Sequence, residues 1–255
     1  MSSSPLLSLI VPVWGSEPLL PELIQKTADD PGLEWIVAAV EPACELKEVA
    51  AAQQIQLVQC ERPSRGEQMN CGAARARGQL LVFHHADTEL TEEHILALKN
   101  AALAEVVGGA FQRHFDQRHS WMRRFEPFIH RHLQRAMPVF GDQSIFVRRD
   151  VFEELNGYAA IPLMEDLEFS RRLKKRAPLC YLAPAIASST RRFDKIGSWR
   201  SSVFNGALIL LFYLGVSPTR LHRWYYRRKK KQTTESVATR PERERDARQV
   251  PPSSH

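Results

Sequence analysis

Short apolar runs alternate with segments of helical composition along the first three quarters of the chain. The runs are aliphatic or β-branched and typical of buried strands, at residues 6–13, 33–40, 55–59, 79–83, 110–115, 144–148 and 179–183. The segments between them predict helices, chiefly at residues 18–27, 43–53, 65–78, 91–106, 121–137 and 163–175. Alternating strands and helices predict an α/β fold with a mostly parallel sheet flanked by helices, in one domain over residues 6–195.

Residues 63–87 carry most of the candidate chemistry. We expect the helix in this segment to end at Gly78 in the left-handed C-cap conformation, and a buried strand to follow at residues 79–83. That strand delivers His84, His85 and Asp87 to its carboxyl end. The carboxyl ends of the strands are where open α/β sheets bind their ligands.

An aspartate at this strand end, with an imidazole two residues before it, predicts a hard-ligand site for a divalent cation that carries a diphosphate. Arg65 lies in a Pro-Ser-Arg-Gly turn, where its guanidinium can hold an anion through two hydrogen bonds. The same residues allow a simpler interpretation, because short motifs match by chance. In that interpretation Asp87 caps the helix that begins near Thr91, and Arg65 is solvated.

A second cluster of charge opens the predicted helix at residues 163–175. Glu165 and Asp166 fall in its first turn, and basic residues fall in its last turn. This arrangement complements the helix dipole and is routine in proteins. Composition alone therefore favours a purely electrostatic role for the two acids.

The order of these motifs resembles that of family 2 glycosyltransferases, which have the Rossmann-like GT-A fold. The nucleotide-sugar half of that family is matched by Asn-x-Gly-x-x-x-Ala-x-Gly at residues 70–78, an apolar strand and a terminal aspartate. A narrower pair of strings, Arg-Gly-x-Gln-Met-Asn at residues 65–70 and His-Ala-Asp-Thr at residues 85–88, resembles the bacterial radical-SAM/selenodomain-associated transferase 2 group.

The resemblance implies a role for each matched side chain. In the family the strand-end motif reads Asp-x-Asp, so Asp87 is carried over as a metal ligand, and His85 stands in the place of the first acid. The resemblance also implies contacts with the nucleotide sugar from the end of the first strand and from the helix at residues 65–78. These contacts fall on Pro12, Arg65, Gln68 and Asn70.

Glu41 and Arg192 complete the expected donor site. The family places an acid at the end of the second strand, where this chain has Ala39, and Glu41 follows two places later. Glu41 is either the substitute or an exposed loop residue, since alternate residues of a strand face opposite ways. Arg192 belongs to a polar loop with two guanidinium groups, which suits a diphosphate; the alternative is a solvated loop.

Residues 141–172 resemble the acceptor-side half of the same family. Gly141, an apolar strand, Gly157 and the pair Glu165-Asp166 follow the family's order. The resemblance implies that Asp166, with Glu165, is the base that deprotonates an acceptor hydroxyl. The implied reaction moves a sugar from a nucleotide-diphosphate donor to that hydroxyl, with Mg²⁺ or Mn²⁺ as cofactor and with inversion at the anomeric carbon.

Two other functions are compatible with the sequence. A nucleotidyltransferase shares a Rossmann-like sheet and a metal-bound diphosphate, but it predicts a glycine-rich loop where the segment after Val13 has only Gly15. A non-catalytic protein that binds nucleotide sugars or a membrane is also compatible, because His85 and Ala39 stand where the family has acids.

The basic excess of the chain belongs to its C-terminal part. Lysine and arginine exceed aspartate and glutamate by 35 to 29, but residues 217–255 hold 11 basic and 4 acidic residues, which leaves 24 basic and 25 acidic residues before them. This distribution argues against a nucleic-acid-binding face on the domain and for an appendage that meets an anionic surface. The four cysteines are scattered, so neither a zinc site nor a disulfide framework is expected.

The C-terminal part predicts attachment to a membrane without crossing it. The apolar run at residues 199–216 is shorter than the roughly 20 residues that a span needs. We expect an apolar helix followed by an aromatic and polybasic segment over residues 196–231, and a disordered tail over residues 232–255. No signal peptide is expected, which predicts a cytoplasmic protein that binds the inner face of a membrane; alternatively, residues 203–214 pack on the domain.

Overall fold

The computed structural model describes residues 5–15, 17, 20–53, 55–86, 88–114, 139–187 and 198–227. Two predicted site residues, Asp87 and Arg192, lie outside the described residues. So do the predicted helix at residues 121–137, the basic run at residues 228–231 and the tail at residues 232–255. The chain divides into two compact units, Met1–Ser202 and Val203–His255.

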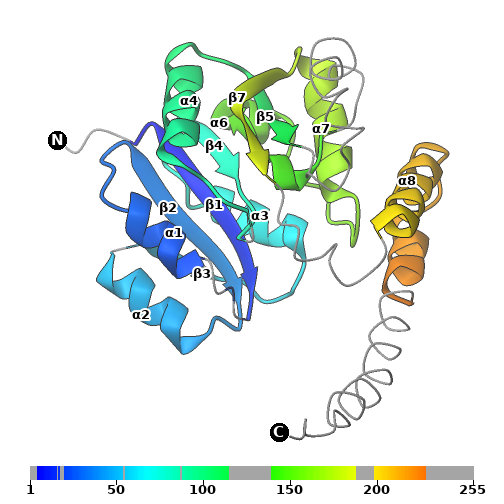
Figure 1. Ribbon diagram of the computed structural model, residues 1–255, viewed down its shortest axis with the longest axis horizontal. Coiled ribbons are helices and arrows are strands. Elements are labelled where there is room, and N and C mark those ends of the chain that lie inside the picture. The colour runs from blue at the N-terminus through cyan, green and yellow to red at the C-terminus, as the bar shows by residue number, and fades with distance from the viewer. Residues whose placement is uncertain are drawn as a thin grey trace, which may run out of the picture. The chain divides into compact units, whose positions relative to one another are not determined.

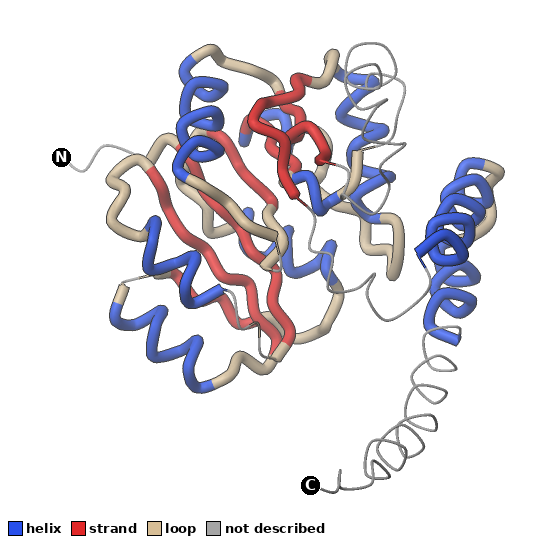
Figure 2. Tube along the Cα trace, viewed as in Figure 1, coloured by secondary structure: helices blue, strands red, loops and turns tan. Residues whose placement is uncertain are grey.

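The first unit is built on one twisted seven-stranded sheet (Figures 1 and 2). In spatial order the strands are β3 (Gln56–Gln59), β2 (Leu33–Val40), β1 (Leu7–Trp14), β4 (Leu80–Phe83), β6 (Ile145–Arg148), β5 (Gly108–His114) and β7 (Cys180–Ala187). All paired strands are parallel except at β6, which runs antiparallel to both β4 and β5. The mostly parallel sheet predicted from the sequence is confirmed.

Helices cover both faces of the sheet, because alternate residues of its buried strands face opposite ways. Leu9 and Val11 of β1 join an apolar cluster with α1 (Leu20–Thr27), α2 (Cys44–Ala52) and α4 (Glu92–Leu103). Ile10, between them, joins a second cluster on the other face. That cluster includes residues of α3 (Arg65–Ala73), α6 (Arg149–Glu154) and α7 (Glu165–Arg176).

The helix α3 ends five residues before the predicted end at Gly78. Its C-cap is Ala74 in the right-handed conformation, and Gly78 does not have the left-handed conformation that we expected. Gly78 is needed for another reason. A Cβ there would lie 2.6 Å from the backbone of Leu7 and Ser8, so the glycine lets the chain pass against the start of β1.

Glycines also open β5, where the sequence predicted only the break of a helix. Gly108 and Gly109 begin the strand and pair with β6. A Cβ on Gly109 would meet the carbonyl oxygen of Cys180 in β7, so a larger residue would force the two strands apart. The last strand, β7, is also longer than predicted and continues to Ala187.

The second unit contains two helical stretches of the described residues. The helix α8 (Ser198–Tyr213) begins just before the boundary and is followed by Gly215 at φ +87° and by a helical stretch at residues 218–227. The backbone N–H of Gly215 donates to the carbonyl of Phe212, and the N–H of Val216 donates to the carbonyl of Leu211. These two hydrogen bonds cap α8. No helix of the described residues has both the length and the apolarity to cross a membrane.

Candidate active site

The site lies at the carboxyl ends of β1, β2 and β4. β1 lies between β2 and β4 in the sheet, and the chain continues from β1 to β2. The connections that leave the carboxyl ends of β1 and β4 therefore diverge, and a ligand-binding crevice is expected between them. Trp14 and Val40 are register partners at this edge, and Trp14 is 63% exposed there. β6 adds the amino end of an antiparallel strand, which brings Ser144 next to the end of β4.

His84 anchors the loop that follows β4. Its ring is fully buried, with Nδ1 2.7 Å from Ser144 Oγ and Nε2 3.1 Å from the carbonyl oxygen of Thr88. Because a carbonyl only accepts, Nε2 carries the proton, and in the neutral ring Nδ1 accepts from the Ser144 hydroxyl. The imidazole therefore holds both ends of the short loop that contains His85 and Asp87. The sequence predicted His84 at this strand end but indicated no role for it.

Gly141 is the point at which the two predicted halves of the site meet. It begins the short helix η3 (Gly141–Gln143), and its N–H donates to Asp166 Oδ2 at 2.7 Å. A Cβ on Gly141 would lie 2.5 Å from His85 Nε2 and 3.5 Å from Asp166 Oδ2. The imidazole and the carboxylate thus approach the same backbone position, although 81 residues separate them in sequence.

Glu165 is a buried carboxylate, and the adjacent Asp166 carboxylate is half-buried. Asp166 accepts from Gly141 N and, through Oδ1, from Leu167 N at 2.7 Å. Burial raises the pKa of Asp166 above its ordinary value, although these hydrogen bonds and the Arg65 charge oppose the rise. Burial also raises the pKa of Glu165, and the neighbouring Asp166 charge raises it further. Both acids are therefore stronger bases than exposed carboxylates.

Arg65 connects the start of α3 to these acids. Its Nη1 lies 3.9 Å from Glu165 Oε1, and 40% of the Arg65 side chain is exposed. The neighbouring Gly66 permits this approach, because a Cβ there would lie 3.1 Å from the Ala159 carbonyl oxygen. Arg65 is therefore both the counter-charge of the acidic pair and a cation that solvent, or an anionic ligand, can reach.

Gln68 and Asn70 make hydrogen bonds to the protein backbone. Buried Gln68 donates through Nε2 to the carbonyls of Val13 at 2.7 Å and Ala38 at 2.9 Å, which joins the ends of β1 and β2 to α3. Asn70 donates to the carbonyl of Tyr158 and accepts from its N–H, both at 2.8 Å. These bonds position the walls of the site, and contact of either side chain with a nucleotide stays a prediction.

Glu41 and Pro12 lie at the same sheet edge. Glu41 is exposed, directly after β2, and has a left-handed backbone at φ +50°. Pro12 is half-buried within β1 and pairs in register with Ala38. The roles that the sequence predicted for them stay predictions. The exposed indole of Trp14 was not singled out, although an aromatic residue at a strand end is a sequence signal for a stacking surface.

The residues of this edge fit a divalent cation that is shared with a phosphate ligand. Among the described residues no group of three or more His, Cys, Asp or Glu side chains could hold a metal alone. The loop supplies the His85 imidazole and, outside the described residues, the Asp87 carboxylate. Thr88 Oγ1 adds a buried hydroxyl without a hydrogen-bond partner in the described part of the chain. Mg²⁺ is commonly held in this way, by one or two carboxylates together with substrate phosphates.

Comparison with known families identifies the chain. A family model described as Glycosyl transferase family 2 matches residues 8–155, which is more than half of the chain. The chain belongs to this family. The resemblance to family 2 glycosyltransferases is confirmed, and membership of this family makes the protein an enzyme. The narrower resemblance to the radical-SAM/selenodomain-associated transferase 2 group stays a prediction. No curated protein sequence matches the chain.

Solved glycosyltransferases share its fold at low sequence identity. A mannosyltransferase from Pyrobaculum calidifontis, in complex with GDP-Man and Mn²⁺, is 16% identical with a TM-score of 0.58; the match covers 82% of this chain and 62% of that one. A glucosyl-3-phosphoglycerate synthase from Mycobacterium tuberculosis, in complex with Mn²⁺, UDP-Glc and glycerol 3-phosphate, is 17% identical with a TM-score of 0.50, covering 77% and 76%. The GT-A fold predicted for this chain is confirmed by these similarities.

The glycosyltransferase site is bounded by strained backbone. Glu41, Ser144 and Met164 are non-glycine residues with positive φ, at +50°, +51° and +68°. They stand at the end of β2, before β6 and immediately before Glu165 of α7. Such conformations cost on the order of 1–3 kcal/mol each and tend to gather at functional sites. The sequence carried no signal for them, because none of the three is a glycine or an asparagine.

An aromatic cluster lies behind the acidic pair. Phe83, Phe152, Tyr158 and Phe169 pack with ring centroids 4.5 to 6.5 Å apart. Arg172 ties the preceding turn to α7, because it pairs with Glu168 at 2.7 Å and donates to the carbonyls of Leu155 and Gly157. The glycosyltransferase therefore holds its acids on a rigid apolar base that also excludes water.

One cysteine pair departs from the expectation of scattered thiols. Cys60, after β3, and Cys71, in α3, are free, and the Cys60 thiol donates to the carbonyl of Val58 at 3.8 Å. Burial, together with the neighbouring Cys71 thiol, raises the pKa of Cys60 to about 12. The thiol is therefore protonated at neutral pH and a weak nucleophile.

We expect the buried Glu165 to make the free energy of unfolding of this glycosyltransferase depend on pH. Because its pKa is higher in the folded than in the unfolded chain, the folded state binds more protons between the two values, and the free energy of unfolding falls as pH rises through them. The Glu165→Gln substitution removes this decrease in the free energy of unfolding. The melting temperature of the variant relative to wild type should therefore increase from about pH 4 to about pH 8.

The matched control is Glu153→Gln, which removes the same charge from an exposed position of α6. Its melting temperature relative to wild type should change little over this range. A difference for Glu165→Gln that stays constant or shrinks with rising pH would contradict the raised pKa.

Proposed function

We propose that the enzyme transfers a sugar from a nucleoside-diphosphate sugar to an acceptor hydroxyl, with a divalent cation and with inversion at the anomeric carbon. The observation that carries the proposal is the approach of His85 and Asp166 to Gly141. It joins a strand-end loop suited to a metal–diphosphate with a half-buried carboxylate suited to proton abstraction. Family membership favours glycosyl transfer as the reaction class.

The cation would be held by Asp87 and His85, beside the Thr88 hydroxyl. Bound Mg²⁺ or Mn²⁺ supplies neutralisation of the charge that grows on a leaving diphosphate. Support comes from the solved relatives, which hold Mn²⁺ together with GDP-Man or with UDP-Glc. His84 contributes through position, because its two hydrogen bonds fix the loop that presents these ligands.

The donor would lie along the edge from β2 to α3. Arg65 presents an exposed guanidinium for the diphosphate, and Trp14 offers an indole face for the base. Glu41 directly follows Val40, the register partner of Trp14, and Pro12 lies two residues before Trp14 in β1. Arg192 is proposed as a second cation for the diphosphate. Gln68 and Asn70 are assigned to positioning, since their amides already bind backbone groups.

Asp166 is proposed as the general base. The acceptor hydroxyl gives its proton to the carboxylate while its oxygen attacks the anomeric carbon opposite the leaving diphosphate, and this single displacement inverts the configuration. Its raised pKa brings the carboxylate nearer to the operating pH, which strengthens it as a base. Glu165 contributes a second negative charge next to it, and Gly141 fixes its orientation.

A nucleotidyltransferase remains the competing reaction, and the products distinguish the two. Glycosyl transfer releases a nucleoside diphosphate, whereas nucleotidyl transfer releases pyrophosphate.

We further propose that the second unit binds an anionic membrane surface. Its described residues expose large apolar and aromatic side chains: Leu210, Tyr213, Leu214, Trp224 and Tyr226. The stretch at residues 218–227 adds three arginines to the aromatic ones, and further bases follow in sequence. Amphipathic aromatics favour the headgroup layer, and each basic residue near an anionic surface adds about 1 kcal/mol.

The metal role is tested by nucleotide binding. We expect Asp87→Asn to abolish the Mn²⁺-dependent part of the thermal shift that UDP-, GDP-, ADP- or TDP-sugars produce, while the melting temperature without ligand stays near that of wild type. His85→Ala should have a smaller effect. Equal Mn²⁺-dependent shifts in wild type and Asp87→Asn would exclude the role. If only His85→Ala lost the Mn²⁺-dependent shift, the metal role would belong to the His85 imidazole and not to Asp87.

The base role predicts that binding and turnover separate in Asp166→Asn. The amide can still accept the hydrogen bond from Gly141, so the donor dissociation constant should change by less than about threefold. The turnover number should fall by about 10² to 10⁴, because proton abstraction is lost. Calorimetry of donor binding and single-turnover kinetics measure the two effects. Parallel loss of donor affinity and thermal stability would assign Asp166 to helix stabilisation.

Membrane binding is tested by vesicle flotation. The full chain should float with anionic vesicles at low salt, be released in large part at high salt, and stay behind with neutral vesicles. A chain that ends at Val216 should bind anionic vesicles more weakly, and Trp224→Ser in the full chain should reduce binding at high salt, where the apolar contribution remains. A full chain that fails to float at low salt would end the proposal.

A further inference from the structure

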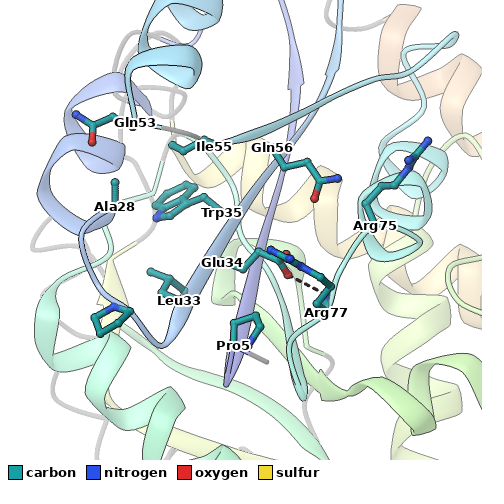
Figure 3. Close-up of a pocket in the computed structure, with 11 residues that line it drawn as sticks. Pro5, Ala28, Leu33, Glu34, Trp35, Gln53, Ile55, Gln56, Arg75 and Arg77 are labelled. Atoms are coloured by element: carbon teal, nitrogen blue, oxygen red, sulfur yellow. Dashed lines mark hydrogen bonds and ion pairs between the residues drawn. The ribbon is translucent and has the colours of Figure 1, made fainter. Parts of the chain in front are cut away.

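Buried polar side chains hold the two edges of the sheet in different ways. At the amino edge, Glu34 accepts hydrogen bonds from Ser8 Oγ at 2.6 Å and from Arg77 Nε at 2.7 Å, and the Glu34–Arg77 pair lines a cavity of about 540 Å³ (Figure 3). These bonds join groups of the same edge. At the carboxyl edge the side chain of Gln143, which is 6% exposed and ends η3, reaches from the candidate active site to β5.

The side-chain amide of Gln143 is bound at both of its polar atoms. Its Nε2 donates to the carbonyl of Phe111 in β5 at 2.9 Å, and its Oε1 accepts from the N–H of Phe140 at 3.2 Å. A carbonyl only accepts and an N–H only donates, so the two partners fix the direction of the amide. Neither an ionised carboxylate nor an apolar side chain can make both bonds.

Gln143 stands where the pairing of β5 with β6 stops. Within the described residues, β5 pairs with β6 only at Gly108 and Gly109, and the same register continued along β5 would bring Phe111 opposite Ser144. Ser144 has a left-handed backbone at φ +51°, which does not continue an extended strand. Phe111 is fully buried, so its carbonyl needs a donor from the protein. The amide of Gln143 supplies that donor.

The η3 turn carries the N–H that orients the candidate base. Gly141, two residues before Gln143, donates to Asp166 Oδ2 at 2.7 Å. A single 3₁₀ turn has few hydrogen bonds of its own, so its geometry depends on its anchors. Ser144, on the other side of Gln143, is held separately, because it bonds His84 and leads into the paired residues of β6. The contact that depends most on Gln143 is therefore the one at Asp166.

A second tie between β5 and η3 lies nearer to solvent. Arg113 of β5 pairs with Asp142, and its guanidinium lies 4.8 Å from the ring centroid of Phe140. The Arg113 and Asp142 side chains are 30% and 27% exposed, so water weakens their ion pair. The ion pair restrains the outer side of η3, while the buried amide of Gln143 sets the position of its backbone.

We propose that Gln143 is a positioning residue for sugar transfer. Its bond to β5 holds η3 so that the Gly141 N–H orients the Asp166 carboxylate toward the acceptor hydroxyl. This inference rests on the proposed function, in which Asp166 is the general base. Gln143 itself touches no substrate, so its loss acts on turnover through Asp166 and leaves the donor site at the ends of β1 and β4 in place.

The test compares Gln143→Met and Gln143→Glu with wild type. Methionine removes both hydrogen bonds, whereas an ionised glutamate keeps the acceptor for Phe140 N–H and places a second acceptor against the Phe111 carbonyl. Each variant should lower the turnover number in single-turnover kinetics about 10-fold to 100-fold, because a small displacement of the base misaligns proton transfer. The donor dissociation constant, measured by calorimetry, should stay within about threefold of wild type. Gln79→Glu, at an exposed position before β4, adds the same charge and should keep wild-type turnover.

Acid should rescue Gln143→Glu selectively. Burial favours the neutral form of a carboxyl, and a protonated carboxyl donates through its O–H, which restores the bond to Phe111. The turnover number of Gln143→Glu relative to wild type should therefore rise as the pH falls from about 8 to about 6. The same ratio for Gln143→Met should stay constant. If Gln143→Met does not fold, a constant ratio for Gln143→Glu overturns the proposal and a rising one supports it.

The Gly141 amide signal in NMR reports on the position of η3 without turnover. Its chemical shift should change in Asp166→Asn, which alters its acceptor, and in both Gln143 variants, but not in Gln79→Glu. A change in Asp166→Asn without one in Gln143→Met would overturn the proposal even where sugar transfer is established. So would wild-type turnover in Gln143→Met, or a parallel loss of donor affinity and melting temperature in both Gln143 variants. If wild type transfers no sugar, the proposed function fails, and the Gly141 signal still decides whether Gln143 holds η3.

Discussion

The hydrogen bond from Gly141 N to Asp166 is the interaction on which the catalytic edge depends. It fixes the first residue of η3 against the first turn of α7, and it leaves no room at Gly141 for a side chain because His85 occupies that space. A half-buried carboxylate loses part of its hydration, and that loss opposes its charge. Two backbone N–H groups offset part of that loss and at the same time orient the oxygens. Stability and chemistry are therefore set by the same contacts.

Arg65 balances the charge of the acidic pair more than it stabilises the fold. A contact of 3.9 Å to a side chain that is 40% exposed is a weak ion pair, of the kind worth about 1 kcal/mol or less. The rigidity of the site comes instead from neutral groups. The amides of Gln68 and Asn70 join α3 to the strand ends and to the turn before α7, and the aromatic rings behind Glu165 fill the space beneath it. Arg65 thus remains available to an anion without loosening the frame.

Patterning and glycine placement predicted most of the fold, because buried strands and amphipathic helices leave strong periodic signals. Residues 33–40 form a strand with the predicted bounds, and the order of strands and helices is as expected. The predicted end of α3 was wrong. Gly78 is required because the backbone of β1, 70 residues earlier in the chain, passes close to it, and no local sequence signal distinguishes this requirement from that of a C-cap. In the same way the sequence indicated Glu165 and Asp166 as candidate site residues. It could not predict that Asp166 and His85 approach each other at Gly141, because that arrangement depends on the tertiary structure. His84 was placed at the strand end without a role, and Ser144 and Met164 were not singled out, because their roles depend on hydrogen bonds and backbone angles that composition does not record.

The direction of the strands places the candidate active site and the Glu34 hydrogen-bond network at opposite edges of the sheet. Parallel strands gather their carboxyl ends at one edge, where the connecting loops are long enough to carry His85, Glu41 and Trp14. Their amino ends meet at the other edge, and there a single buried acid, Glu34, sets the position of an exposed arginine. α3 runs between these edges, with Arg65 at its first turn and Arg75 just after its last. An anion that binds Arg65 therefore contacts the first turn of α3, and the hydrogen bonds of Gln68 and Asn70 in the middle of this helix hold it to the ends of β1 and β2 and to Tyr158.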